Sequence, residues 1–369
     1  MKGVNNLLTS IIILTHNQLL YTKECIQSIR TYTKLEEYEL IVVDNASTDG
    51  TVEWLMNQPD IIVIKNTTNM GFPKGCNQGI VQAKGTNILL LNNDVIVTEG
   101  WLTNLLMCLY KHENIAAVGP VTNSASYGTA IPVAYTSLKE MQQFASRYNV
   151  SDEKKWERRL KLIGFCLCIK RCVLDEVGLL DEQFTPGNYE DDDICLRMAQ
   201  RGYTLYLCKD TFVHHYGSLS WKEDIQGFTN ILTLNAEKFE KKWKFSSANL
   251  TIYSGLIHHL QHNISLENEF QVLHVGSGCG ATLLEIQNQY PHVKIFGVES
   301  NYHAHLFSKQ IATTLCIPYE NISKEFVDTK FHAILLTIPT SKSQLERVCN
   351  SLSSLLTANG LIYIQNEQA

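Results

Sequence analysis

The chain has 369 residues and a mass of 41.8 kDa, more than one hydrophobic core usually holds, so we expect two domains. An apolar fraction of 44% and a charged fraction of 18% exclude a disordered or fibrous protein. The formal net charge of -6 and a pI near 6.1 disfavour nucleic acid and other polyanions as partners.

Cysteine usage and the lack of long apolar runs bear on the cellular compartment. The eleven cysteines are scattered, with no repeated CxxC pair, and several lie in apolar runs, such as Cys166 and Cys168. This pattern is typical of a reduced, intracellular protein. The first nine residues lack the features of a signal peptide, and no apolar run approaches the roughly 20 residues that span a bilayer. We therefore expect a cytoplasmic protein without a transmembrane segment, whose membrane contact would be peripheral.

Short runs rich in leucine and β-branched residues predict strands in the first hundred residues. These runs lie at 10–14, 40–43, 61–64 and 87–91, each bounded by Asn, Asp, Gly or Pro. Continuous apolar runs of this length indicate strands buried on both faces, as in a parallel sheet. Residues 19–31 and 51–58 have helical periodicity, which gives successive βαβ units. The fold class of this part is therefore α/β.

Polar residues follow the first two strands at the edge where open parallel sheets bind ligands. The carboxylate of Asp44 can accept a hydrogen bond from the imide N–H of uracil or thymine, with Thr15 and Asn17 beside it. Capping of the next helix by Ser47 and Asp49 explains the same segment. From these residues alone, both interpretations have equal weight.

Two later segments predict a metal site. The fourth strand ends in Asp94, whose carboxylate could hold a divalent ion that neutralises a nucleotide diphosphate. A surface turn explains this segment equally well. The neighbouring His214 and His215 follow a strand-like run, and a neutral imidazole could complete the metal shell. Because neighbouring strand residues point to opposite faces, we expect at most one of them to be a ligand.

A run of four acids from Glu190 to Asp193 leads directly into a helix with apolar spacing. Carboxylates at a helix start are stabilised by the helix dipole, so capping and a solvated face explain most such runs. Here the preceding Pro186, Gly187 and Tyr189 indicate a shaped loop, which favours one carboxylate as a general base.

Taken together and in order, these motifs resemble the large family 2 of glycosyltransferases with the GT-A fold, especially its rhamnosyltransferase-like branch. The resemblance covers about residues 9 to 225. The stretches that carry it are SIIILTHN (10–17), VVDNASTDG (42–50), NMGFPKGCN (69–77), NND (92–94), GFCLCIKR (164–171), EDDDICLR (190–197) and HYGS (215–218).

The resemblance implies a Rossmann-like mixed sheet and an inverting transfer of sugar from a UDP- or dTDP-sugar to a glycan, lipid-linked or protein acceptor. It also implies Mn²⁺ or Mg²⁺ as cofactor, with Asp94 and His215 as ligands, although NND replaces the common DxD. Asp191 matches the catalytic base, with Asp192 and Asp193 adjoining it. The positions that match donor-binding residues are Thr15, Asn17, Asp44, Asn45, Asn69, Lys74, Asn77 and Asn93.

A lysine-rich stretch at 237–244 is typical of a helix that leaves the first domain. We therefore expect this domain at 1–245 and a helical linker at 246–268. A second βαβ series, expected at 269–369, has predicted strands at 271–275, 293–298, 333–338 and 361–364. The series stops near its fifth strand, so we expect a smaller, incomplete domain.

The second series begins with a strand and a GxGxG turn, in which Gly276, Gly278 and Gly280 let the backbone approach a cofactor. Glu299 ends the next strand, where an acid can hold ribose hydroxyls. These residues resemble the Rossmann-like S-adenosylmethionine-dependent methyltransferases, which implies that cofactor, although His274 replaces the acid that usually precedes the first glycine. A structural or partner-binding role is the alternative.

Three functions remain open on the sequence. The first is a glycosyltransferase, the second is a bifunctional glycosyltransferase and methyltransferase, and the third is a carbohydrate-binding scaffold that has lost its chemistry. A nucleotidyltransferase is disfavoured, because residues 15–18 do not form the glycine-rich, arginine-containing loop that such enzymes use. The sugar, the acceptor and the oligomeric state are not determined by the sequence.

Overall fold

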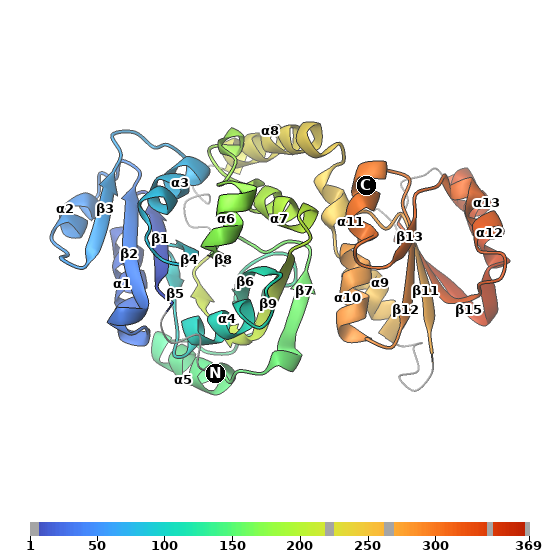
Figure 1. Cartoon of the computed structure of the whole chain (residues 1–369), viewed down its shortest axis with the longest axis horizontal. Coiled ribbons are helices and arrows are strands. Elements are labelled where there is room, and N and C mark those ends of the chain that lie inside the picture. Colours follow the sequence, from blue (N-terminus) through green and yellow to red (C-terminus); the bar gives the residue numbers. More distant parts are fainter. Residues whose placement is uncertain (1–6, 218–224, 262–268, 338–341, 366–369) are drawn as a thin grey trace. The chain divides into compact units, whose positions relative to one another are not determined.

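The computed structural model describes residues 7–217, 225–261, 269–337 and 342–365 (Figure 1). It forms two compact units, Met1–Lys238 and Phe239–Ala369. Ser218 of the predicted HYGS motif and the last residue of the strand predicted at 333–338 lie outside the described residues. In the parts of the chain that the structure describes, no helix is long and apolar enough to cross a membrane.

The first unit is built on a mixed eight-stranded sheet with the order β3-β2-β1-β4-β8-β6-β9-β7. Strands β1 to β4 are parallel to one another, and β8 pairs antiparallel with both β4 and β6, which confirms the predicted mixed α/β sheet. The strands are β1 (Thr9–Thr15), β2 (Tyr38–Asp44), β3 (Ile61–Lys65), β4 (Asn87–Asn92), β6 (Ile115–Val121), β7 (Trp156–Arg159), β8 (Cys166–Lys170) and β9 (Thr204–Phe212). A separate two-stranded sheet pairs β5 (Val95–Ile96) with β10 (His214–His215).

Helices cover both faces of this sheet (Figure 1). Side chains of α1 and α4 belong to the hydrophobic cluster on one face, and side chains of α3, α5, α6 and α7 belong to the cluster on the other. The helices are α1 (Leu19–Tyr32), α2 (Thr51–Met56), α3 (Phe72–Gln82), α4 (Trp101–Leu109), α5 (Leu138–Tyr148), α6 (Arg171–Val177), α7 (Glu190–Gln200) and α8 (Ile225–Trp243).

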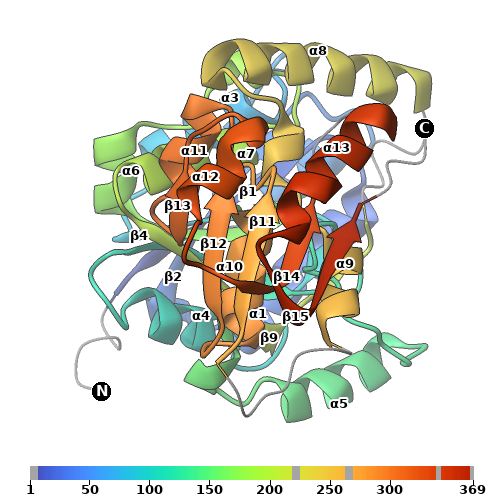
Figure 2. The ribbon, with the colours of Figure 1, turned by 90° about the vertical axis from the view of Figure 1, so that its right-hand side faces the viewer.

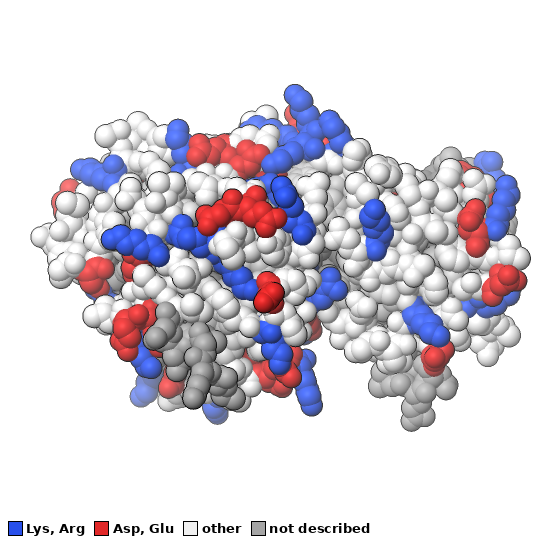
Figure 3. All heavy atoms as spheres, viewed as in Figure 1, with Lys and Arg blue, Asp and Glu red and all other residues white. Residues whose placement is uncertain are grey.

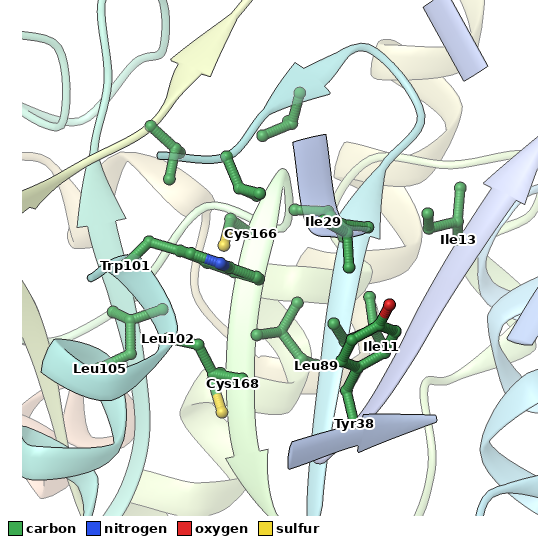
Figure 4. Close-up of a cluster of buried hydrophobic side chains, with 14 of the residues drawn as sticks. Ile11, Ile13, Ile29, Tyr38, Leu89, Trp101, Leu102, Leu105, Cys166 and Cys168 are labelled. Atoms are coloured by element: carbon green, nitrogen blue, oxygen red, sulfur yellow. The ribbon is translucent and has the colours of Figure 1, made fainter. Parts of the chain in front are cut away.

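Trp101 lies in the centre of the cluster on the first face. Its ring is fully buried beside Leu102, Leu105 and Cys166, and Figure 4 shows these side chains converging between α4 and the sheet. The indole N–H donates to Thr33 Oγ1 at 3.0 Å, so the one polar atom of the ring is satisfied. Burying large apolar side chains, at about 1.5–3 kcal/mol each, stabilises the sheet whose edge carries the polar loops.

The second unit has a five-stranded, fully parallel sheet with the order β13-β12-β11-β14-β15. Figure 2 shows β12, β11, β14 and β15 side by side. The strands are β11 (Gln271–Val275), β12 (Lys294–Val298), β13 (Thr313–Leu315), β14 (Phe331–Leu336) and β15 (Leu356–Ile364). The helices are α9 (Ser254–Gln261), α10 (Ala281–Gln289), α11 (Tyr302–Ser308), α12 (Ile322–Glu325) and α13 (Lys342–Ser353).

The structure differs from the prediction at the start of this unit. The segment expected as a linker contains α9, whose Leu256, Ile257 and Leu260 are buried against β11 and α10 in the core of the unit. The first unit ends at Lys238, within the last third of α8. These apolar side chains make α9 part of the second domain, because three of them face one side of the helix and need a partner surface.

Charged side chains of both signs are interspersed on the face shown in Figure 3.

Candidate active site

A cavity of about 380 Å³ lies at the carboxyl ends of β1, β2 and β4. It is walled by the loops after these strands, by the loop before α3 and by the segment that leads into α7. Seven of the predicted site residues line it: Thr15, Asn45, Asn69, Asn93, Asp94, Asp191 and His215. The cavity therefore brings together residues that are far apart in the sequence.

The pairing of β5 with β10 sets Asp94 beside His215. His215 pairs with Val95, and the backbone N–H of Tyr216 donates to the carbonyl of Asp94 at 3.1 Å. As a result, Nε2 of His215 lies 3.2 Å from Oδ1 of Asp94, with both side chains less than 10% exposed. The ring of Phe165 stacks on the imidazole at 5.2 Å and fixes its orientation.

The hydrogen bond of Nδ1 determines which ring nitrogen of His215 carries a hydrogen. Nδ1 lies 2.7 Å from the carbonyl oxygen of Ser124, which can only accept, so Nδ1 carries a hydrogen. In a neutral ring, Nε2 then points its lone pair at a carboxylate oxygen, and Nε2 has no hydrogen-bond partner in the described structure. This arrangement is repulsive unless a positive charge, either a proton or a cation, lies between the two atoms.

Asp94 and His215 therefore fit a divalent cation as two of its ligands. In the described part of the chain, no third His, Cys, Asp or Glu completes a metal cluster with them. The remaining ligands would come from substrate oxygens and water. His214 is directed elsewhere: its Nδ1 contacts the Tyr135 hydroxyl at 2.6 Å, and burial lowers the pKa of His214 to about 4.

The aspartates of the acidic run have different partners in the structure. Asp193 accepts from Arg197 at 2.8 Å, and Asp192 forms an ion pair of 2.7 Å with Lys161. Asp191 is the aspartate of the run that lines the cavity. Its Oδ2 accepts from the backbone N–H of Gly164 at 3.0 Å, and its Oδ1 accepts from the N–H of Asp192 at 2.9 Å. These two bonds fix the carboxylate and leave further lone pairs for a ligand.

Glu190 is a lining residue that the sequence analysis treated only as part of the acidic run. Its side chain is buried, and Oε2 has no partner in the described structure. Burial and the neighbouring charge of Asp191 raise the pKa of Glu190 well above its usual range, which favours the protonated form. A neutral acid thus lies next to a carboxylate in the same cavity. Nothing in the sequence distinguishes Glu190 from the three aspartates that follow it, because its burial depends on the fold.

Several predicted donor residues hold the walls of the cavity together through hydrogen bonds. Asn93 donates to Thr15 Oγ1 at 3.3 Å, and Asn45 donates to the carbonyl of Gly71 at 3.2 Å. Asn69 accepts from the N–H of Gly71 at 2.9 Å. Gly71 has a φ of +78°, and a Cβ there would lie 2.8 Å from Pro186 Cα, so only glycine fits. This close contact places the loop before α3 beside the segment that leads into α7.

Four predicted donor residues are not among the lining residues of the cavity: Asn17, Asp44, Lys74 and Asn77. The Asn17 amide oxygen accepts from the N–H of Thr48 at 2.8 Å, so it supports the loop after β2. The side-chain amide of Asn77 forms two hydrogen bonds with the backbone of Leu180. Its Oδ1 accepts from the N–H at 3.0 Å, and its Nδ2 donates to the carbonyl at 2.9 Å. These two amides are used within the protein and do not reach the cavity.

Asp44 is fully buried at the end of β2. Its Oδ2 accepts from the N–H of Ser47 at 3.0 Å, and its Oδ1 has no partner in the described structure. Asp49 accepts from the N–H of Thr51, the first residue of α2, at 3.1 Å, and Ser47 Oγ accepts from the N–H of Asn17 at 2.7 Å. The N-cap of α2 is Gly50, so the capping of this helix by Ser47 and Asp49 is not found.

Comparison with known proteins agrees with this geometry. Residues 10–171 match glycosyl transferase family 2, so the first unit contains a glycosyltransferase domain of this family. The low-salt glycan biosynthesis hexosyltransferase Agl10 of Haloferax volcanii is 26% identical over 180 residues, which cover 46% of this chain and 56% of that protein. An uncharacterized protein of Sinorhizobium fredii is 24% identical over 251 residues, covering 64% of this chain and 28% of the relative.

The chain thus spans about a quarter to a half of the length of these two relatives. Among solved structures, the crystal structure of GalNAc-T7 with UDP, GalNAc and Mn²⁺ is similar to 57% of this chain and 44% of that one, with 17% identity and a TM-score of 0.47.

Proposed function

We propose that the first unit, which contains a family 2 glycosyltransferase domain, transfers a sugar from a UDP- or dTDP-sugar to a hydroxyl of a glycan, a lipid-linked saccharide or a protein, with inversion at the anomeric carbon. The observation that carries this proposal is the convergence of Asp191 with the Asp94–His215 pair in one cavity. In this cavity Asp191 can accept a proton, and the Asp94–His215 pair can hold a cation.

The proposed reaction uses the carboxylate of Asp191 as general base. The acceptor oxygen forms a bond to the anomeric carbon while the bond from that carbon to the diphosphate breaks. The hydroxyl proton passes to Asp191, and the electron pair leaves with the nucleoside diphosphate. The hydrogen bonds from Gly164 and Asp192 hold the carboxylate in place during this transfer.

A divalent cation, when bound, would neutralise charge on the departing diphosphate. Asp94 and His215 would hold it, since their facing atoms require a positive charge between them. Thr15, Asn45, Asn69 and Asn93 line the cavity as the proposed donor wall. We keep Asp44 as the proposed reader of the base, because its Oδ1 is unpartnered in the described structure.

The alternative of a scaffold that binds carbohydrate without chemistry is disfavoured by the cost of this arrangement. The buried carboxylic acid of Glu190 reduces stability unless a ligand pairs with it, and the facing atoms of Asp94 and His215 need a proton or a cation between them.

The test is a donor screen with the full chain, Mn²⁺ or Mg²⁺ and a panel of UDP-, dTDP- and GDP-sugars. We expect metal-dependent release of nucleoside diphosphate from one donor. Asp191→Asn should reduce turnover by about 10²- to 10⁴-fold while donor affinity is retained, because base catalysis and binding are separate demands. Asp175→Asn, at an exposed position of α6, is the matched control. Near wild-type turnover of Asp191→Asn would overturn the assigned base.

A further inference from the structure

In the second unit, the carboxyl ends of the parallel strands form the kind of sheet edge that usually binds a cofactor. In this sheet β11 is central, β12 and β13 lie on one side of it, and β14 and β15 lie on the other. The glycine loop follows β11, and Glu299 follows β12, so both are at the carboxyl edge beside the point where the strand order reverses. Ligands of open α/β sheets bind at this point.

The backbone N–H groups of the glycine loop are already used within the protein. All five, from Gly276 to Gly280, donate to protein oxygens. Gly276 and Ser277 donate to the carbonyl of Val298 at 2.9 and 3.1 Å, and Gly280 donates to Ser277 at 2.9 Å. Because a bound ligand would need some of these donors, the loop as it stands offers none of them to a cofactor.

The acid expected to hold a ribose is also used. Both carboxylate oxygens of Glu299 accept from the backbone: Oε2 from the N–H of Gly278 and Oε1 from the N–H of Asn301, each at 2.7 Å. The side chain is 4% exposed. Glu299 therefore joins the loops after β11 and β12 to each other and does not face an open site.

The space over the glycine loop is filled by a segment of the same chain, residues 244–253. The carbonyl of Asn249 accepts from the N–H of Cys279 at 2.8 Å. A Cβ at Gly278, which has a φ of +55°, would lie 2.6 Å from that carbonyl oxygen and 3.0 Å from Asn249 Cα. Only glycine permits this approach, so the glycine that suggested a cofactor serves the packing of the chain against itself.

Further hydrogen bonds hold both ends of residues 244–253. The carbonyl of Lys244 accepts from the amide of Asn301 at 2.9 Å. At the other end, the hydroxyl of Thr282 accepts from the N–H of Tyr253 at 3.0 Å and donates to the carbonyl of Thr251 at 3.3 Å. The segment is thus bound by the loop after β11, by the loop after β12 and by the first turn of α10.

We propose that the cofactor edge of the second unit binds residues 244–253 of its own chain in place of S-adenosylmethionine or a dinucleotide. The residues predicted to hold the cofactor do meet in space, but their polar groups do not fit it, because each is paired within the protein. The edge works as an intramolecular clamp for the segment that connects α8 to α9. This assignment is independent of the proposed sugar transfer.

The first test is calorimetric titration of the full chain with millimolar S-adenosylmethionine, S-adenosylhomocysteine and NAD. We expect no saturable heat from any of them. Saturable binding at one site per chain would overturn the clamp, whatever the outcome of the donor screen.

The second test measures the clamp itself by hydrogen exchange of residues 244–253. Thr282→Val removes the hydroxyl that holds Tyr253 and Thr251, and we expect exchange of this segment to become about 3- to 10-fold faster, the effect of roughly one hydrogen bond. Thr313→Val, at an exposed position of β13, is the control and should change nothing. Donor hydrolysis should be the same in both variants. Unchanged exchange in Thr282→Val would show that the segment is not held there.

Discussion

The carboxyl edges of the two sheets contain similar polar residues, but they differ in whether these residues are hydrogen-bonded within the protein. In the first unit, His215 Nε2 and Asp94 Oδ1 face each other at 3.2 Å and need a proton or a cation between them, and Glu190 keeps an unpartnered oxygen. In the second unit, the loop amides and both oxygens of Glu299 are paired within the protein. Ser277 and His274 also keep an unpartnered atom, but Ser277 Oγ lies beside Gly297 of β12. A binding edge is therefore recognised by unsatisfied groups that converge, and a glycine motif alone does not identify one.

The largest effect that distinguishes the two edges is expected from Asp94→Asn. The neutral amide cannot hold a cation against diphosphate oxygens, so kcat/KM should fall by about 10²- to 10³-fold, equivalent to about 3–4 kcal/mol. A second readout is thermal stability: Mn²⁺ with UDP should raise the Tm of the wild type and leave that of Asp94→Asn unchanged. His215→Ala should raise the metal concentration needed for activity.

Asp175→Asn should behave like the wild type in both measurements. If the Tm of Asp94→Asn rose with Mn²⁺ and UDP as much as that of the wild type, the cation would be bound elsewhere. The first edge would then be no more a metal site than the second.

A smaller effect, on stability alone, is expected from Gly278→Ala in the second unit. The new Cβ would lie 2.6 Å from the Asn249 carbonyl in a left-handed backbone conformation, so we expect a loss of about 1–3 kcal/mol in the free energy of unfolding. Gly255→Ala in α9, where a Cβ meets its nearest atom at 3.9 Å, should not lower the stability, because alanine favours the helix. Urea unfolding measures both, and equal stabilities would mean that residues 244–253 do not cover the loop.

The strands were predictable because each is a continuous apolar run ended by turn residues. The runs at 10–14 and 87–91 correspond to β1 and β4 within one residue at each end. The three-residue β13 was missed, since Thr313–Leu315 has no apolar run of its own and is held only by pairing with β12. Short edge strands of this kind are fixed by tertiary contacts and not by local pattern.

The site was predicted at the level of residues but not of their roles. Residue type and the family resemblance could suggest Asp94 and His215 as ligands of one metal ion, but the sequence could not show their contact, because it depends on the pairing of β5 with β10. The sequence could not show that the Asn77 amide donates a hydrogen bond to the Leu180 carbonyl, or that Glu299 accepts one from the N–H of Gly278. A polar residue in a motif can satisfy a ligand or a neighbouring backbone, and only the fold decides which.

The smallest expected effect concerns pH and His274, the residue that stands where an acid usually precedes the glycine loop. Its Nε2 lies 3.0 Å from the hydroxyl of Thr337, which donates to the carbonyl of Gly276 at 2.6 Å, so Nε2 carries the hydrogen. Its Nδ1 is buried with no acceptor in the described structure. Burial lowers the pKa of His274 from 6.5 to about 3, because a second proton would be desolvated and unpaired.

The sign of the pH effect follows from this lowered pKa. The unfolded chain binds a proton at His274 below about pH 6.5 and the folded chain does not, so the stability of the second unit falls as pH decreases from 6.5 toward 3. His274→Gln should make this fall shallower by up to about 1.4 kcal/mol per pH unit, measured by urea unfolding with hydrogen exchange of residues 271–298. His292→Gln, at an exposed position, should keep the slope of the wild type. Parallel curves for all three proteins would mean that folding does not lower the pKa of His274, so that its ring would not be shielded from water as the structure has it.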